Sequence, residues 1–176
     1  MHVDSAAPPA RKSLRGLKLA DEGLPVDMSF QGFHVLAVDD DDASLRLMVK
    51  VLGDLGVARV VTARSGSEAF ALLQSTGRPF DCILCDLKMP SGNGLQLLKA
   101  IRCGEAKGTR PDACFVFLTA LNDAPTIRTA GQLDANGYLV KPLTVERLRM
   151  ALARGKARAF AIDFGRYSVV PVPQTA

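Results

Sequence analysis

Four consecutive carboxylates, at positions 39–42, follow the short apolar run VLAV. This arrangement is unfavourable by itself, because two carboxylates about 4 Å apart repel by roughly 4 kcal/mol at the effective dielectric constant of a protein surface. A bound cation, a neighbouring lysine or the solvation of an exposed turn would each offset the repulsion. The chemistry open to this cluster therefore depends on the residues that the fold brings beside it.

Three other polar residues stand at the ends of apolar runs farther along the chain. Asp86 ends FDCILCD, Thr119 ends ACFVFLT and Lys141 follows NGYLV. Beside acidic residues, an aspartate, a hydroxyl and an amine can together bind a divalent cation and a phosphoryl group. This chemistry requires that the ends of the separate runs meet.

The elements that would position these residues alternate regularly from residue 33 onward. Apolar runs predict strands at 33–38, 58–63, 80–85, 113–120 and 136–140. Amphipathic stretches predict helices at 43–55, from about 65, at 94–102, at 124–133, and from 144 past 152. Strands that are apolar almost throughout are typical of a parallel sheet covered on both faces. We therefore predict an α/β fold in which five helices doubly wind a five-stranded parallel sheet.

The ligand site of such a sheet lies beyond the carboxyl ends of its strands. Local signals support the helices: Gly56 stands where a glycine commonly follows a helix, and Ser65 with Glu68 forms a capping box. The strand ends then bring together the candidate residues Asp39, Asp40, Asp86, Thr119 and Lys141.

The composition indicates one globular domain with short extensions. The chain has 176 residues, of which 48% are hydrophobic and 23% charged. It has no apolar stretch of membrane-spanning length and its first thirty residues lack a secretory signal, so a cytoplasmic location is expected by default. Residues 154–176 carry four basic and one acidic side chain, most of the net charge of +4, which favours a solvated tail over nucleic-acid binding.

The cysteines and histidines do not form a metal or redox site. Cys82 and Cys85 make a CxxC pattern, but residues three apart on a strand point to opposite faces. The four cysteines, including Cys103 and Cys114, are therefore expected to be reduced and largely buried. The two histidines do not lie in a ligand-spaced cluster.

Three segments follow from the composition along the chain. Residues 1–31 mix prolines, glycines and charges and are expected to form a flexible extension, within which Met28 is a second possible start. Residues 32–153 form the predicted domain, and residues 154–176 continue its last helix into a tail. The tail segment AIDFGRYSVVPVP contains apolar residues, so we expect it to fold back on the domain or to pack against a partner subunit.

The motifs VDDDD, CDLKMPSGNG, LTA and YLVKP, each at the end of a predicted strand, resemble those of a known family. They are similar to the receiver domain of bacterial two-component response regulators, the CheY-like family. The resemblance spans roughly residues 33–152 and implies a flavodoxin-like fold.

The resemblance implies a phosphoacceptor site. Asp86 would take a phosphoryl group from a phosphohistidine, Lys141 would pair with the phosphate oxygens and Thr119 would donate its hydroxyl to them. Thr119 and Tyr138 would form the switch that changes the surface of the fourth helix, fifth strand and fifth helix.

The implied cofactor is Mg²⁺, which prefers carboxylate, carbonyl and water oxygens. Asp41 falls where the family often has an acidic residue. Asp42 stands where the family commonly has a proline, and it is expected to N-cap the first helix instead. The implied metal ligands are Asp39, mainly through water, Asp40, Asp86 and the backbone carbonyl of Lys88.

The resemblance implies a stand-alone receiver in phosphorelay signal transduction, and not an enzyme beyond its own phosphorylation and dephosphorylation. Its donor would be a sensor histidine kinase or a histidine phosphotransfer protein, and it would signal through protein contacts without binding DNA or a membrane. A homodimer is possible, whereas the sequence does not name the kinase, the stimulus or the downstream target.

Two alternatives remain open at the level of sequence. One is a receiver-like scaffold whose output surface is engaged without phosphorylation. The other is a haloacid-dehalogenase-like phosphatase, whose nucleophile follows the first strand in a DxDx[TV] pattern. Here Asp39 and Asp41 are followed by Ala43, and Asp86 would have no role in that reaction.

Overall fold

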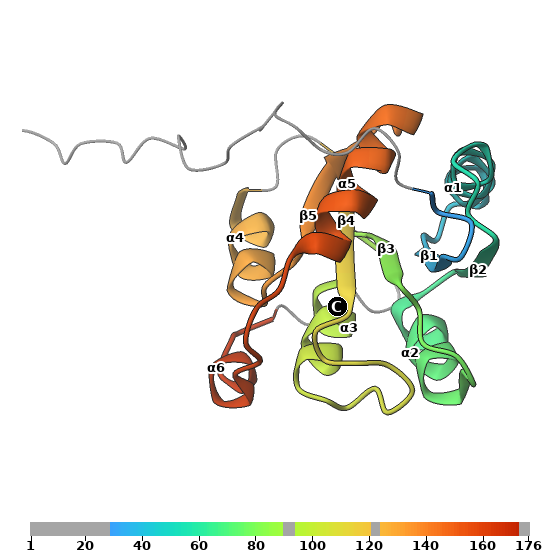
Figure 1. Ribbon diagram of the computed structural model, residues 1–176. Coiled ribbons are helices and arrows are strands. Elements are labelled where there is room, and N and C mark those ends of the chain that lie inside the picture. Colours follow the sequence, from blue (N-terminus) through green and yellow to red (C-terminus); the bar gives the residue numbers. More distant parts are fainter. Residues whose placement is uncertain (1–28, 90–93, 121–123, 173–176) are drawn as a thin grey trace, which may run out of the picture.

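Five parallel strands form the centre of the structure, a computed structural model that describes residues 29–89, 94–120 and 124–172 (Figure 1). Their order in the sheet is β2-β1-β3-β4-β5, so the strands that carry Asp39 and Asp86 are neighbours. The predicted parallel sheet is confirmed. The strands are β1 (His34–Val38), β2 (Arg59–Ala63), β3 (Cys82–Asp86), β4 (Cys114–Thr119) and β5 (Gly137–Val140).

The described residues contain six helices, one more than predicted. The five expected helices differ from their predicted bounds by at most a few residues, and the additional one, α6, lies in the C-terminal tail. The helices are α1 (Asp42–Asp54), α2 (Gly66–Ser75), α3 (Gly94–Arg102), α4 (Ala124–Gln132), α5 (Val145–Ala157) and α6 (Phe164–Ser168).

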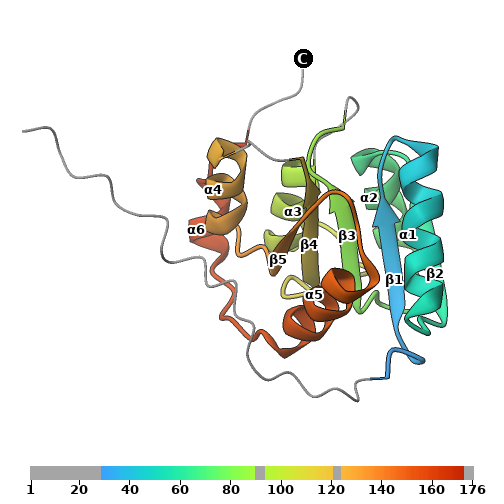
Figure 2. The same cartoon turned by 90° about the horizontal axis from the view of Figure 1, so that it is seen from above.

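The helices cover both faces of the sheet, with α1 and α5 on one face and α2, α3 and α4 on the other (Figure 2). Cys82 lies in the core beneath α1 and α5, whereas Cys85 lies in the core beneath α3, so the two thiols of the CxxC pattern point to opposite faces as predicted. Burial holds the pKa of both thiols well above its usual value. All four cysteines are free, and Cys103 alone among them is not fully buried.

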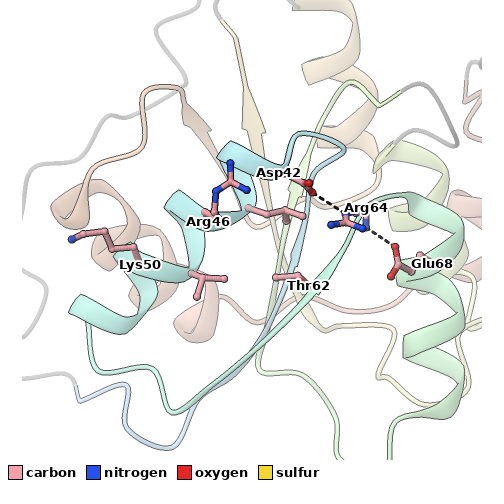
Figure 3. Close-up of a pocket in the computed structure, with 8 residues that line it drawn as sticks. Asp42, Arg46, Lys50, Thr62, Arg64 and Glu68 are labelled. Carbon is pink, nitrogen blue, oxygen red and sulfur yellow. Dashed lines mark hydrogen bonds and ion pairs between the residues drawn. The ribbon is translucent and has the colours of Figure 1, made fainter.

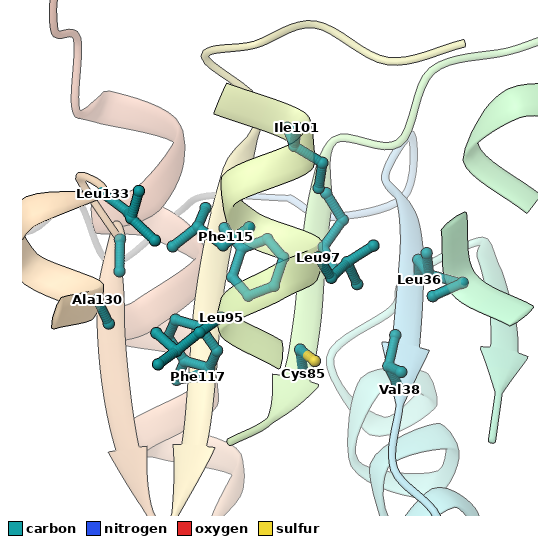
Figure 4. Packing of buried hydrophobic residues seen from close by; sticks show 14 of the residues in the cluster. Leu36, Val38, Cys85, Leu95, Leu97, Ile101, Phe115, Phe117, Ala130 and Leu133 are labelled. Carbon is teal, nitrogen blue, oxygen red and sulfur yellow. The ribbon is translucent and has the colours of Figure 1, made fainter. Parts of the chain in front are cut away.

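Aromatic residues of β4 form the centre of the core on the α3 side. Figure 4 shows Phe115 and Phe117 of this strand against Leu95 and Leu97 of α3. The two phenylalanine rings lie 4.8 Å apart between centroids, and both side chains are buried. Successive apolar layers of this kind fix α3 on the sheet, and the residues at the start of α3 lie directly beside Asp86.

Hydrogen bonds at the helix ends test the predicted caps. The prediction that Asp42 caps the first helix is wrong: Asp41 is the N-cap, and its carboxylate accepts a hydrogen bond from the backbone N–H of Ser44 at 2.8 Å. This hydrogen bond lowers the pKa of Asp41. Ser65 caps α2 as predicted by accepting from the N–H of Glu68, although the Glu68 carboxylate reaches back to the N–H of residue 64 and not to that of Ser65.

Residues near both ends of the described chain are buried in the core, although the sequence analysis assigned them to extensions of the domain. Phe30, which we assigned to the extension 1–31, is buried and packs edge-to-face on Phe33; residues 1–28, including Met28, lie outside the described residues. The tail folds back on the domain, one of the two outcomes expected for it. Its charge is not simply solvated, because Arg158 and Arg166 pair with Asp134. Among the described helices, none is long and apolar enough to cross a membrane.

Candidate functional site

The carboxyl ends of β1, β3, β4 and β5 bring the predicted site residues to one edge of the sheet. Val38 of β1 is in register with Cys85 of β3, so the residues that come next, Asp39 and Asp86, lie side by side. Asp86 is in turn in register with Leu118 of β4. Thr119 is in register with Val140, which places Lys141 just beyond the same edge. Residues far apart in sequence therefore meet because the register of the parallel strands brings their carboxyl ends to the same edge.

Lys141 bridges the two aspartates. Its Nζ lies 2.8 Å from Oδ2 of Asp39 and 2.6 Å from Oδ1 of Asp86. The carboxylates are well shielded, with side-chain exposures of 2% for Asp39 and 11% for Asp86, whereas Lys141 retains 34%. Two negative charges thus face one positive charge, and Lys141 is the most solvent-accessible side chain of the three.

The remaining oxygens of the two carboxylates accept backbone hydrogen bonds. Oδ1 of Asp39 accepts from the N–H of Asp41 at 2.9 Å, and Oδ2 of Asp86 accepts from the N–H of Lys88 at 2.8 Å. These bonds fix the orientation of both side chains and shape the loops that follow β1 and β3. The loop after β3 is described only as far as residue 89.

Burial and pairing shift the pKa values of the trio. Burial raises the pKa of Asp86, and the hydrogen bond from Lys141 offsets part of that rise. Burial alone would lower the pKa of Lys141, but the hydrogen bonds to Asp39 and Asp86 raise it. The amine is therefore charged at neutral pH, and the buried carboxylate of Asp86 depends on it.

The chemistry of the donors suits Mg²⁺, although their conformation is not that of a finished metal site. Carboxylate oxygens of Asp39 and Asp86 lie together, and the exposed Asp40 follows directly at the mouth of the cluster. Lys141 stands between the first two, and the described residues hold no group of three or more acidic, histidine or cysteine side chains that could hold a metal ion. The carboxylates would therefore have to come closer together to hold a metal ion.

The two predicted switch residues lie between the site and α4. The Thr119 side chain is buried, and its hydroxyl donates to the carbonyl of Ala120 at 2.9 Å. Tyr138 lies inward: its ring stacks on Phe117 and its hydroxyl donates to the carbonyl of Ile127 in α4 at 3.2 Å. Burial raises the pKa of Tyr138 to about 12, so its hydroxyl keeps its proton. The switch roles themselves stay predictions.

Gly94 is a site residue that the sequence analysis treated only as the start of a helix. A Cβ at this position would lie 2.7 Å from the backbone carbonyl oxygen of Asp86 and 2.7 Å from the ring of Phe117. Such distances are too short for any side chain, so the glycine allows α3 to begin directly against the end of β3. The GNG sequence at 92–94, whose last residue begins α3, was the available signal.

A surface groove between α1 and β2 adjoins the acidic cluster and shares Asp42 with it. Figure 3 shows Arg64 between Asp42 and Glu68, with Nε of Arg64 2.8 Å from Oδ1 of Asp42. Glu68 accepts a hydrogen bond from the backbone N–H of Arg64 at 2.7 Å, and Lys50 pairs with Asp54 on α1. The Arg64–Asp42 pair joins the start of α1 to the loop after β2.

Comparison with known proteins identifies relatives over most of this chain. The family model for the response regulator receiver domain matches residues 35–153. The chain is 33% identical over 121 residues to a probable chemotaxis protein CheY of Rhizobium etli, covering 67% of this chain and 88% of that protein. It is 35% identical over 135 residues to the sensor protein GacS of Pseudomonas syringae, covering 77% of this chain but only 14% of that protein.

Solved structures show the same relationship. The structure of chemotaxis protein CheY4 of Vibrio cholerae superposes with a TM-score of 0.61 at 32% identity, covering 69% of this chain and 97% of that one. The residues that the family model matches include the strand ends that carry the acidic cluster, Asp86, Thr119 and Lys141.

Proposed function

This chain belongs to the response regulator receiver domain family of two-component signalling, and from that premise we propose that it accepts a phosphoryl group on Asp86. The observation that carries the proposal is the contact of one lysine amine with both Asp86 and Asp39. A shielded carboxylate with a fixed cation beside it has the parts that nucleophilic attack on phosphorus requires.

The transfer forms one bond and breaks one bond. A carboxylate oxygen of Asp86 attacks the phosphorus of a phosphohistidine, and the phosphorus–nitrogen bond breaks as its electron pair returns to the imidazole. The product is an acyl phosphate on Asp86. Lys141 can leave Asp86 and pair with a phosphoryl oxygen while it keeps its contact with Asp39, so positive charge stays at the reacting centre.

The count of charges supports a requirement for Mg²⁺. The trio of Asp39, Asp86 and Lys141 carries one net negative charge, Asp40 adds another, and an incoming phosphoryl group adds more. Bound Mg²⁺ would supply positive charge and orient the phosphoryl oxygens. The residues proposed to hold it are Asp40, Asp39 mainly through water, Asp86 and the backbone carbonyl of Lys88.

The proposed donor is a sensor histidine kinase or a histidine phosphotransfer protein. The similarity to a segment of a sensor protein, GacS, supports a place in such a phosphorelay. We further propose that the chain acts as a stand-alone receiver whose output is a protein contact. Movement of the Thr119 hydroxyl toward the phosphoryl group, together with Tyr138, would change the surface around α4, β5 and α5.

Intact-protein mass after incubation with Mg²⁺ and acetyl phosphate tests the proposal. We expect one phosphoryl group, stable in acid and labile in base, on the wild type and on the control Asp54→Asn, whose aspartate lies on the surface of α1. Asp86→Asn, or removal of metal with a chelator, should abolish the gain. Failure of the wild type to gain mass under any of these conditions would favour a scaffold with a silent site.

Membership in the receiver family leaves the phosphatase alternative without support.

A further inference from the structure

The chain beyond α5 forms a C-terminal strap, residues 158–172, that passes from one face of the sheet to the other. Helix α5 packs on the same face as α1, whereas Tyr167 and Val170 of the strap belong to the core beneath α3 and α4. The strap therefore passes β5, which is the edge strand, and brings α6 against α3 (Figures 1 and 2).

The docking of the strap uses apolar burial and specific hydrogen bonds. The Tyr167 side chain is completely buried, with an exposure of 0%, and Val170 is buried beside it. Lys99 of α3 donates from its Nζ to the backbone carbonyls of Ser168 at 2.9 Å and Val170 at 2.8 Å. The strap is therefore an ordered part of the fold and not a loosely attached tail.

Three side chains of the strap converge on Asp134, which lies two residues beyond the end of α4. The Tyr167 hydroxyl donates to Oδ2 of Asp134 at 2.8 Å, and the guanidinium of Arg166 pairs with the same oxygen. Arg158 pairs with Oδ1 at 3.2 Å. Leu133, the residue before Asp134, is buried in the same core as Tyr167. The strap thus holds the C-terminal end of α4 through both charge and packing.

A second connection runs through Arg102 at the end of α3. Its buried guanidinium donates to the backbone carbonyls of Leu133 at 3.1 Å and Asp134 at 3.0 Å. The ring of Phe160, in the strap, lies 4.8 Å from the guanidinium carbon of Arg102. The strap therefore covers the contact that fixes the end of α4 to α3.

The opposite end of α4 is connected to the phosphoacceptor site. Thr119 and Ala120 lead from β4 toward α4, and the Thr119 hydroxyl donates to the Ala120 carbonyl. Tyr138 holds the middle of α4 through the carbonyl of Ile127. For Thr119 to contact a phosphoryl group, its hydroxyl must leave the carbonyl of Ala120. Helix α4 thus lies between the site and the strap.

We propose that the C-terminal strap is a clamp on the end of α4 and that its docking opposes phosphorylation of Asp86. The inference rests on the proposed function of Asp86. In this structure the docked strap on Asp134 accompanies the Thr119–Ala120 hydrogen bond, which contact of Thr119 with a phosphoryl group would break. Because coupling between two binding events is reciprocal, strap docking must weaken phosphoryl binding by the same factor by which the phosphoryl group weakens docking.

Substitutions in the strap can distinguish a specific effect on α4 from a general loss of stability. Tyr167→Ala removes the buried anchor, Tyr167→Phe keeps the ring but loses the bond to Asp134, and Val169→Ala is the matched control because Val169 is 78% exposed. Circular dichroism first establishes that each full-length variant is folded. If Tyr167→Ala fails to fold, Tyr167→Phe carries the test.

Hydrogen exchange without any phosphodonor measures the clamp directly. We expect the amides at the C-terminal end of α4 to exchange about ten-fold faster in Tyr167→Ala, with a smaller change in Tyr167→Phe and none in Val169→Ala. Equal exchange in all four proteins would overturn the clamp.

Calorimetric titration with beryllofluoride and Mg²⁺, a mimic of the phosphoryl group, measures the coupling. We expect at least about five-fold tighter binding to Tyr167→Ala than to the wild type, and wild-type affinity for Val169→Ala. Unchanged or weaker binding of beryllofluoride to Tyr167→Ala would refute the proposal that strap docking opposes phosphorylation of Asp86. If the wild type and every variant fail to bind beryllofluoride, the proposed function of Asp86 and the coupling both fail, and the exchange result still decides whether the strap is a clamp.

Discussion

Replacement of Lys141 by methionine is expected to lower the free energy of unfolding by about 2 kcal/mol at pH 7. The amine nitrogen contacts Asp39 at 2.8 Å and Asp86 at 2.6 Å, so the two carboxylates lie close on either side of it. At a separation of about 5 Å, two unit charges repel by roughly 3 kcal/mol at an effective dielectric constant of 20. Solvent access through the partly exposed lysine reduces this figure, while methionine preserves much of the apolar packing of the stem.

The stability lost in Lys141→Met should depend on pH, because it reflects the charge of Asp86. Burial already raises the folded-state pKa of Asp86 above its ordinary value of 3.8, and removal of Lys141 raises it further. A carboxyl group with a raised folded-state pKa binds more protons in the folded than in the unfolded protein, so stability falls as pH rises through the ordinary pKa. The difference between variant and wild type should therefore be largest near pH 7 and shrink toward pH 4.

Urea unfolding at pH 7 and at pH 4.5 measures both effects. Lys50→Met is the matched control, because Lys50 pairs with Asp54 at 2.9 Å on the surface of α1, where an ion pair contributes at most about 0.5 kcal/mol. The reasoning is refuted if Lys141→Met loses no more stability than Lys50→Met at pH 7, or if its loss is as large at pH 4.5 as at pH 7.

Two further substitutions test the packing behind the site and the strap. Gly94→Ala places a methyl group 2.7 Å from the Asp86 carbonyl, so we expect a loss of about 1 to 3 kcal/mol in urea unfolding and less phosphoryl gain on Asp86; a variant as stable and as readily phosphorylated as the wild type would contradict this. Arg102→Lys keeps the charge but leaves several of the five contacted oxygens without a donor, so we expect a loss of about 3 kcal/mol by the same assay, and a change below about 1 kcal/mol would show that water satisfies them.

The strands and their ends could be predicted from sequence because each apolar run stops at a polar residue. That local signal placed Asp86, Thr119 and Lys141 at the ends of three strands, and the structure brings two of them, Asp86 and Lys141, into contact. Helix ends with a single candidate were also predictable, as at Ser65 and at Gly56, whose φ is +79°. These strand and helix ends could be predicted because each had a single candidate residue.

The N-cap of α1 could not be chosen in the same way, since four aspartates in a row are equally suited by type. The structure shows what decides between them. Oδ1 of Asp39 accepts from the N–H of Asp41, and this turn gives Asp41 the extended backbone conformation of an N-cap, with φ −91° and ψ 116°. The choice therefore depends on the buried position of Asp39, which is a property of the sheet and not of the local sequence.

The path of the C-terminal tail could not be predicted, because it depends on ion pairs between residues far apart in the sequence. Its apolar residues indicated burial, but apolar content cannot distinguish a contact within the chain from a contact with another subunit. The deciding residue is Asp134, 24 positions before Arg158 and 32 before Arg166, whose charges appeared as surplus when the tail was considered by itself. Lys141 and Asp39 are likewise separated by 102 positions. Charges that have no evident partner in the sequence thus become informative once the fold places them. In this protein they fix both the proposed phosphoacceptor site and the strap at the far end of α4.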